Sequence, residues 1–242
     1  MELGGKSPQI VFADAELELA VNGIVAGIFP VSGQTCIAGS RLLVQREIHD
    51  EVVDRLCKIV SPARLGHPEH ADTQIGPIAN EPHFKHILEN IDNAKSGAAK
   101  LVLGGNAVQP ESAPNGWFIE PTIFTGVTPD MPLAREEVFG PLLAVLPFDS
   151  EEDAIRLAND SKFGLAAGIW TRDVTRGIRI ADRIDAGTVY INNYFNATTQ
   201  SPVGGYKQSG YGRESGIEGM KAFLQTKSVW LATEPNQPNP FA

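Results

Sequence analysis

The sequence predicts an α/β fold with a mostly parallel sheet and helices on both of its faces. Short apolar runs rich in β-branched residues alternate with longer amphipathic stretches along most of the chain. The 24 glycines and 17 prolines provide for many short connections between these elements. A chain of 242 residues, 42% of them hydrophobic, can also bury a sizeable core. Because strands and helices alternate, we expect crossover helices on both faces, with right-handed connections.

The apolar runs give the strands. Their β-branched and aromatic content fits strands that are buried on both faces. In chain order the predicted strands are 9–13, 41–45, 100–103, 142–148, 167–170, 188–191 and a late strand at 227–231, with extended chain at 117–124.

The helices are predicted where apolar residues recur at helical spacing, most plainly in Val52, Val53 and Leu56. Asp14 and Ser150 are expected to cap the helices that follow them, since a short polar side chain there can accept a backbone N–H. The predicted helices are 15–30, 49–60, 80–95, 150–158, 174–184 and 217–225. The residues from 234 to 242, rich in Pro and Asn, predict a loosely ordered tail.

The charge balance disfavours two classes of partner. Acidic residues outnumber basic ones by 29 to 20, and a net charge of −9 repels nucleic acid and anionic membrane surfaces. The most apolar stretch, 24–31, is interrupted by Gly27 and Pro30 and is far shorter than the ~20 residues that span a bilayer. No signal peptide is expected at the N-terminus. Two cysteines fit a reducing compartment, so we expect a cytoplasmic protein.

The two cysteines lie in different local contexts. Cys57 is flanked by Leu56 and Ile59 at helical spacing and is expected to be a small buried apolar residue. Cys36 follows Gly33 in a loop and precedes Gly39, just before a predicted strand. Glycines let a backbone approach a substrate, and N–H groups in such a loop can face a developing oxyanion. Cys36 is therefore a candidate nucleophile, although a lone cysteine in a loop is common.

Further motifs occur before the first strand, before the strand at 142–148 and after the strand at 188–191. Taken singly, residues 2–8 (ELGGKSP) fit a glycine turn and residues 135–141 (REEVFGP) fit a helix end. Together with 33–41 (GQTCIAGSR) and 201–214 (SPVGGYKQSGYGRE) they resemble the aldehyde dehydrogenase superfamily, in the order and approximate spacing of that family. The resemblance covers nearly the whole chain apart from the tail.

The resemblance implies oxidation of an aldehyde to a carboxylic acid with NAD or NADP. Cys36 would attack the aldehyde as a thiolate, and hydride loss would leave a thioester on its sulfur. Glu2 would act as the general base that deprotonates the water for hydrolysis of this thioester. A free cysteine has a pKa near ~8.5, so nearby dipoles or a base must favour the thiolate.

The same resemblance assigns three cofactor contacts. Glu137 would accept hydrogen bonds from ribose hydroxyls, Phe139 would pack beside the nicotinamide, and Leu3 would position the nicotinamide amide through its carbonyl. The substrate pocket would be lined by Thr35, Ile37 and the segment 193–203, which ends at Val203, where relatives often carry an aromatic residue.

The resemblance also divides the chain. Residues 1–225 would form the catalytic domain, 226–233 an oligomerisation strand that pairs with a neighbouring subunit, and 234–242 the tail, so we expect a homo-oligomer, a dimer or tetramer in the full-length protein. Members of the family are about twice as long, and the first half of their chain, which supplies most of the cofactor-binding domain, would be absent. The isolated chain would then bind NAD weakly and lack turnover.

Two other functions stay open. A thiol esterase would use Cys36 and Glu2 without a cofactor. An inactive fragment would only self-associate through its late strand. The histidine pairs 67/70 and 83/86 lack further ligands at a diagnostic spacing, so no metal site is expected.

Overall fold

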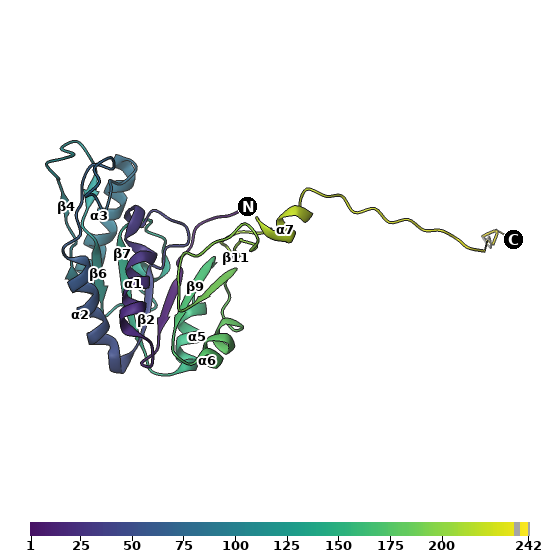
Figure 1. Cartoon of the computed structure of the whole chain (residues 1–242), viewed down its shortest axis with the longest axis horizontal. Helices are drawn as coiled ribbons and strands as arrows, with labels where there is room; N and C mark the ends of the chain where they lie inside the picture. The colour runs from purple at the N-terminus through teal and green to yellow at the C-terminus, as the bar shows by residue number, and fades with distance from the viewer. Residues whose placement is uncertain (235–237, 242) are drawn as a thin grey trace.

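The computed structural model describes residues 1–234 and 238–241, and its centre is a seven-stranded sheet (Figure 1). Every neighbouring pair of strands is parallel except β6 and β3, which are antiparallel. The predicted α/β class is confirmed. The strand order is β10 (Thr188–Ile191), β9 (Ala166–Trp170), β1 (Pro8–Val11), β2 (Arg41–Gln45), β7 (Leu142–Phe148), β6 (Thr122–Thr125) and β3 (Lys100–Leu103).

Helices cover both faces of this sheet. On one face α1 (Leu17–Ile28) and α2 (His49–Val60) pack over one apolar core. On the other, α3 (Glu81–Ser96), α5 (Glu151–Asn159) and α6 (Val174–Ala181) pack over a second core. The remaining elements are the short helices α4 (Pro132–Arg135) and α7 (Gly216–Lys221), the turns η1 (Pro30–Gly33) and η2 (Arg46–Ile48), and the two-stranded pairs β11 (Tyr206–Lys207) with β8 (Phe163–Gly164) and β4 (Ala107–Val108) with β5 (Phe118–Ile119).

Alternation along the strands explains the two cores. In β2 the side chain of Leu43 faces one core, whereas Leu42 and Val44 face the other, and all three are fully buried. A strand that is apolar on both faces needs a helical layer on each side. No helix in the part of the chain that is described combines the length and apolarity needed to cross a bilayer.

One predicted cap is confirmed and one is wrong. The Ser150 hydroxyl accepts the backbone N–H of Asp153, as expected. Asp14 does not cap α1, which begins at Leu17 with no side-chain cap. Its carboxylate instead accepts from the Thr171 hydroxyl and from the Arg176 guanidinium, each at 2.9 Å. These charge-assisted bonds come from the residue that follows β9 and from α6, so distant partners replace the local one.

The C-terminal prediction is only partly correct. The helix predicted at 217–225 is shorter, since α7 ends at Lys221, and the residues predicted as a strand at 227–231 pair with no strand among the residues described. Figure 1 shows this segment leaving the body as extended chain, with Trp230 95% exposed. A strand needs a hydrogen-bonding neighbour, and residues 1–234 and 238–241 offer it none. The oligomerisation role of 226–233 stays a prediction. Of the tail predicted at 234–242, residues 235–237 and 242 lie outside the described part.

Register places two loops at one edge of the sheet. Pro8 of β1 lies opposite Arg41 of β2, so the segments that precede both strands reach the sheet at the same edge. The Arg41 side chain is buried there and donates to the carbonyls of Lys6, Leu157 and Ala158 at 2.8–2.9 Å. The loop before β1 is thereby joined to β2 and to the C-terminal end of α5.

Candidate active site

The structure brings Cys36 and Glu2 together. The Cys36 thiol donates to Glu2 Oε1 across 3.7 Å, a contact between the loops that precede β2 and β1. Cys36 lies half-buried in a turn that follows η1, and Glu2 is exposed. A nucleophile and a carboxylate within hydrogen-bond reach form the pair that covalent catalysis needs.

The glycine-rich segment after β10 anchors Glu2. Glu2 and Gly210 form an antiparallel bridge, and the Leu3 N–H donates to the Ser209 carbonyl at 2.9 Å. Gly210 has φ +126°, and a Cβ there would lie 2.2 Å from the Met1 carbonyl oxygen. Residues 204–216 therefore support the carboxylate that faces the thiol. Local sequence patterns do not predict this role, because the contacting residues lie some 200 positions apart in the chain.

Local electrostatics favour the neutral thiol. The pKa of Cys36 is raised, first by burial and then by the negative charge of Glu2. Backbone N–H groups of Ile37 and of Cys36 itself lower the pKa of the thiol and so act in the opposite direction. Dipoles or a base were expected to favour the thiolate, but the net shift is in the opposite direction, because burial and Glu2 outweigh the two N–H groups.

A pair of glycines lets the loop of Glu2 pass between the Cys36 turn and Glu137. A Cβ on Gly5 would lie 2.5 Å from the Cys36 carbonyl oxygen, and one on Gly4 would lie 2.0 Å from Glu137 Oε2. The Gly5 N–H donates to Glu137 Oε1 at 2.9 Å. Only glycine fits such close backbone approach. Three of the four sequence motifs therefore meet at this loop, and the fourth joins them because the Ser209 hydroxyl donates to the Gly4 carbonyl at 2.8 Å.

Phe139 has a strained backbone that a histidine contacts. Its φ is +57°, and its side chain is 37% exposed. His83 of α3 places Nε2 2.7 Å from the Phe139 carbonyl oxygen and its ring edge-on to the phenyl ring. The sequence pattern raised His83 only as a possible metal ligand and did not predict this contact. The cofactor roles of Glu137, Phe139 and Leu3, which is 48% exposed, stay predictions.

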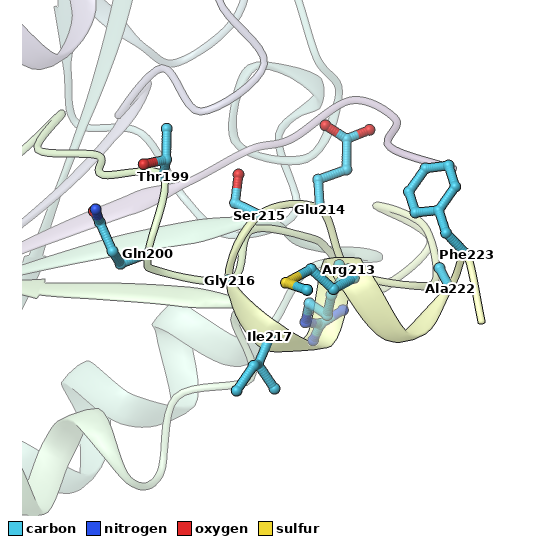
Figure 2. Close-up of a pocket in the computed structure, with 11 residues that line it drawn as sticks. Thr199, Gln200, Arg213, Glu214, Ser215, Gly216, Ile217, Ala222 and Phe223 are labelled. Carbon is cyan, nitrogen blue, oxygen red and sulfur yellow. The ribbon is translucent and has the colours of Figure 1, made fainter.

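The three predicted substrate-pocket residues lie in different local settings. Thr35 and Ile37 flank Cys36 and are half-buried, whereas Val203 pairs with Glu214 through two backbone hydrogen bonds of 2.8 Å. A cavity of about 990 Å³ lies beside α7, between Thr199 and Gln200 on one side and Phe223 on the other (Figure 2). Neither Cys36 nor Glu2 lines this cavity. The substrate pocket therefore stays a prediction.

The two members of each histidine pair lie close together. The rings of His67 and His70 lie 5.4 Å apart, and those of His83 and His86 lie 6.1 Å apart. Within 1–234 and 238–241, no group of three or more His, Cys, Asp or Glu side chains is arranged to hold a metal ion.

Comparison with known proteins identifies relatives of this arrangement. Residues 1–229 match the model of the aldehyde dehydrogenase family. Betaine aldehyde dehydrogenase of Mesorhizobium japonicum is 44% identical over 96% of this chain and 48% of its own length. Betaine aldehyde dehydrogenase of Bacillus subtilis is 43% identical over the whole chain and 49% of its own length. The chain thus spans about half the length of the curated relatives it matches.

Solved structures agree with this result. Betaine aldehyde dehydrogenase of Staphylococcus aureus in complex with NAD⁺ has a TM-score of 0.95 and 41% identity, covering 100% of this chain and 48% of that protein. An NAD-dependent aldehyde dehydrogenase of Sinorhizobium meliloti has a TM-score of 0.93 and 42% identity, covering 98% of this chain and 46% of that protein.

The Glu2 carboxylate is expected to hold the Cys36 pKa up. In Glu2→Gln the negative charge is gone, so alkylation of Cys36 by iodoacetamide at about pH 8 should become faster and its pH profile should move to lower pH. Peptide mass mapping measures the rate at each thiol. Cys57 is the internal control, because its pKa is raised by burial and then by Asp54, not by Glu2. Slower alkylation of Cys36 in the variant would show that Glu2 promotes the thiolate instead.

Proposed function

Because the chain belongs to the aldehyde dehydrogenase family, we propose that Cys36 and Glu2 carry the catalytic steps of an NAD(P)-dependent oxidation of an aldehyde to a carboxylic acid. The observation that supports this most directly is the 3.7 Å contact between the Cys36 sulfur and Glu2 Oε1. The match to a family of oxidoreductases supports the reaction class.

The first step forms a bond to Cys36. Its sulfur attacks the aldehyde carbon as a thiolate, and the carbonyl electron pair moves to oxygen, giving a thiohemiacetal. The thiol proton leaves before or during this attack, and Glu2 Oε1 is the acceptor in contact with it. Because the pKa of Cys36 is raised, this proton transfer adds substantially to the free energy that the first step requires.

The second half of the reaction releases the acid. A bound NAD(P)⁺ supplies the hydride acceptor that turns the thiohemiacetal into a thioester. Glu2 then takes a proton from water, the hydroxide oxygen bonds to the acyl carbon, and the carbon–sulfur bond breaks with its electron pair returning to Cys36. An exposed carboxylate beside the sulfur suits this role, since water reaches it freely.

Cofactor contacts within this chain would come from Glu137, Phe139 and Leu3. Glu137 fits in part, because Oε1 accepts from Gly5 while no described residue donates to Oε2, which leaves that oxygen for a ribose hydroxyl. Phe139 presents an exposed face of its ring. NAD is the first cofactor to test, because the S. aureus relative is solved with NAD⁺.

The names of the relatives suggest where to look for a substrate. Proteins 43–45% identical to this chain are betaine aldehyde dehydrogenases. We therefore propose betaine aldehyde as the first substrate to test, alongside uncharged aldehydes of similar size. Both cysteines are free, which agrees with a thiol-dependent enzyme in the cytoplasm.

The 242-residue chain by itself is expected to bind NAD weakly and to oxidise no aldehyde. The resemblance places the pyrophosphate-binding loop in the part of the family that this chain does not match. Calorimetric titration with NAD⁺ measures the affinity, and NADH formation from betaine aldehyde, followed by absorbance, measures turnover. Steady NADH formation that is lost in Cys36→Ala would disprove the expected inactivity while supporting the role of Cys36.

A second activity, thiol esterase, is favoured by the presence of the Cys36–Glu2 contact within this chain alone. A nitrophenyl ester should acylate Cys36 and release nitrophenol, and Glu2 should assist deacylation. In Glu2→Gln the acyl group should persist about 100-fold longer, the usual lower range for loss of a general base. Intact-mass spectrometry measures its lifetime. Cys36→Ala is the control and should show no acylation at this position. An unchanged lifetime in Glu2→Gln would contradict the assignment of the base.

Self-association through 226–233 is the third proposal. The segment is extended, and Val229, Trp230 and Leu231 are more than 80% exposed. The full chain should sediment as an oligomer, and a chain that ends at Thr226 should sediment as a monomer, since it lacks the strand that makes the contact. A chain that ends at 233 is the matched control and should behave like the full chain. Oligomers of equal size before and after truncation at Thr226 would contradict the proposal.

A further inference from the structure

A buried tyrosine contacts the nucleophile turn from the side opposite solvent. Tyr194 follows β10 in the chain, is 8% exposed, and donates its hydroxyl to the Ile37 carbonyl at 2.8 Å. The two residues are 157 positions apart in the sequence. Burial raises the pKa of the Tyr194 phenol, so its hydroxyl keeps its proton and remains a donor at any physiological pH.

The Tyr194 ring is held on several sides. A Cβ on Gly27 of α1 or on Gly168 of β9 would each lie 2.9 Å from a Tyr194 ring carbon, so both glycines make room for the ring. The rings of Tyr190 and Phe195 lie 5.0 and 5.6 Å from it. A ring so enclosed cannot move without disturbing its neighbours, and its hydroxyl is therefore a fixed point.

Ile37 links this fixed point to the sulfur. The Ile37 carbonyl accepts from Tyr194, and the N–H of the same residue lowers the pKa of the neighbouring Cys36 thiol. The turn has one further internal bond, from the Ala38 N–H to the Thr35 carbonyl at 3.0 Å. The N–H and the carbonyl of Ile37 lie in adjacent peptide planes that share one Cα, so holding the carbonyl limits how far the plane that carries the N–H can turn.

We propose that Tyr194 is a positioning residue for the nucleophile: its hydroxyl holds Ile37 so that the Ile37 N–H stays directed at the Cys36 sulfur. The inference rests on the proposed function, in which Cys36 reacts as a thiolate. The titratable groups that influence this sulfur or couple to it are Glu2 and Tyr194 itself. Glu2 contacts the Cys36 sulfur itself, whereas Tyr194 is bonded to the Ile37 carbonyl.

The decisive variant removes one oxygen. In Tyr194→Phe the ring stays and the hydroxyl is lost, so Ile37 is released and its N–H no longer stabilises the thiolate. The pH profile of Cys36 alkylation by iodoacetamide should move up by about half a unit, which lowers its rate at about pH 8 about threefold. Tyr190→Phe is the matched control, because no hydrogen bond of the Tyr190 hydroxyl is found among residues 1–234. It should leave the profile unchanged.

The alkylation rate of Cys57 distinguishes a positioning role of Tyr194 from a general loosening of the fold. Peptide mass mapping gives its alkylation rate in the same sample. If Tyr194→Phe only loosened the protein, both thiols would react faster. A slower Cys36 with an unchanged Cys57 supports the proposal. An unchanged Cys36 profile, or acceleration of both thiols, overturns it.

A measurement on the unaltered chain covers the case in which Tyr194→Phe does not fold. The Tyr194 hydroxyl proton should be visible by NMR and exchange slowly with water, with a cross peak to the Ile37 side chain or the Ala38 amide. Fast exchange with water overturns the proposal. Failure of the proposed function would show differently, as aldehyde or ester chemistry that survives Cys36→Ala.

Discussion

The parallel pairing of β1 with β2 is the constraint on which the site depends. Because Pro8 lies opposite Arg41, the chain enters both strands at one edge of the sheet. The buried Arg41 guanidinium fixes this edge through three carbonyl acceptors, two of them at the C-terminal end of α5, where the helix dipole favours a cation. The register of the two strands restricts the loops before them to the same edge of the sheet. Cys36 and Glu2 come into contact at this edge.

Burial at this edge favours neutral groups. It is the largest cause of the raised Cys36 pKa, and it lowers the pKa of Lys6 to about 7, with Arg41 contributing in the same direction. Backbone N–H groups oppose this effect of burial on the Cys36 pKa, since they stabilise a thiolate without bringing a full charge into the interior. A nucleophile in such a place depends on how firmly its turn is held. The enclosed tyrosine beside Ile37 matters for that reason.

Local sequence patterns correctly predicted those strands and helices whose hydrophobic periodicity is clear within the segment itself. The runs at 41–45 and 142–148 are strands with those bounds, and the helix at 49–60 is correct to the residue. The motif residues Cys36 and Glu2 also meet as the resemblance implied. The wrong prediction for Asp14 and the missed contact of His83 share one cause. The partners of Asp14 and of His83 come from other elements, far along the chain, and no periodicity or capping pattern reports a bond that only the folded sheet creates.

The sequence of the extended segment after α7 favours a strand, but no strand among the described residues pairs with it. Its β-branched and aromatic residues favour a strand, yet a strand lowers its free energy only through a ladder partner and a surface for its side chains. Here Trp230 and Leu231 are 95% and 85% exposed. Burying one large apolar side chain is worth about 1.5–3 kcal/mol, so even a few of them provide a strong drive toward a second surface. The local pattern specifies a strand, and the described chain lacks the neighbour that would complete it. The self-association proposed for 226–233 would supply both a ladder partner and a surface for these side chains.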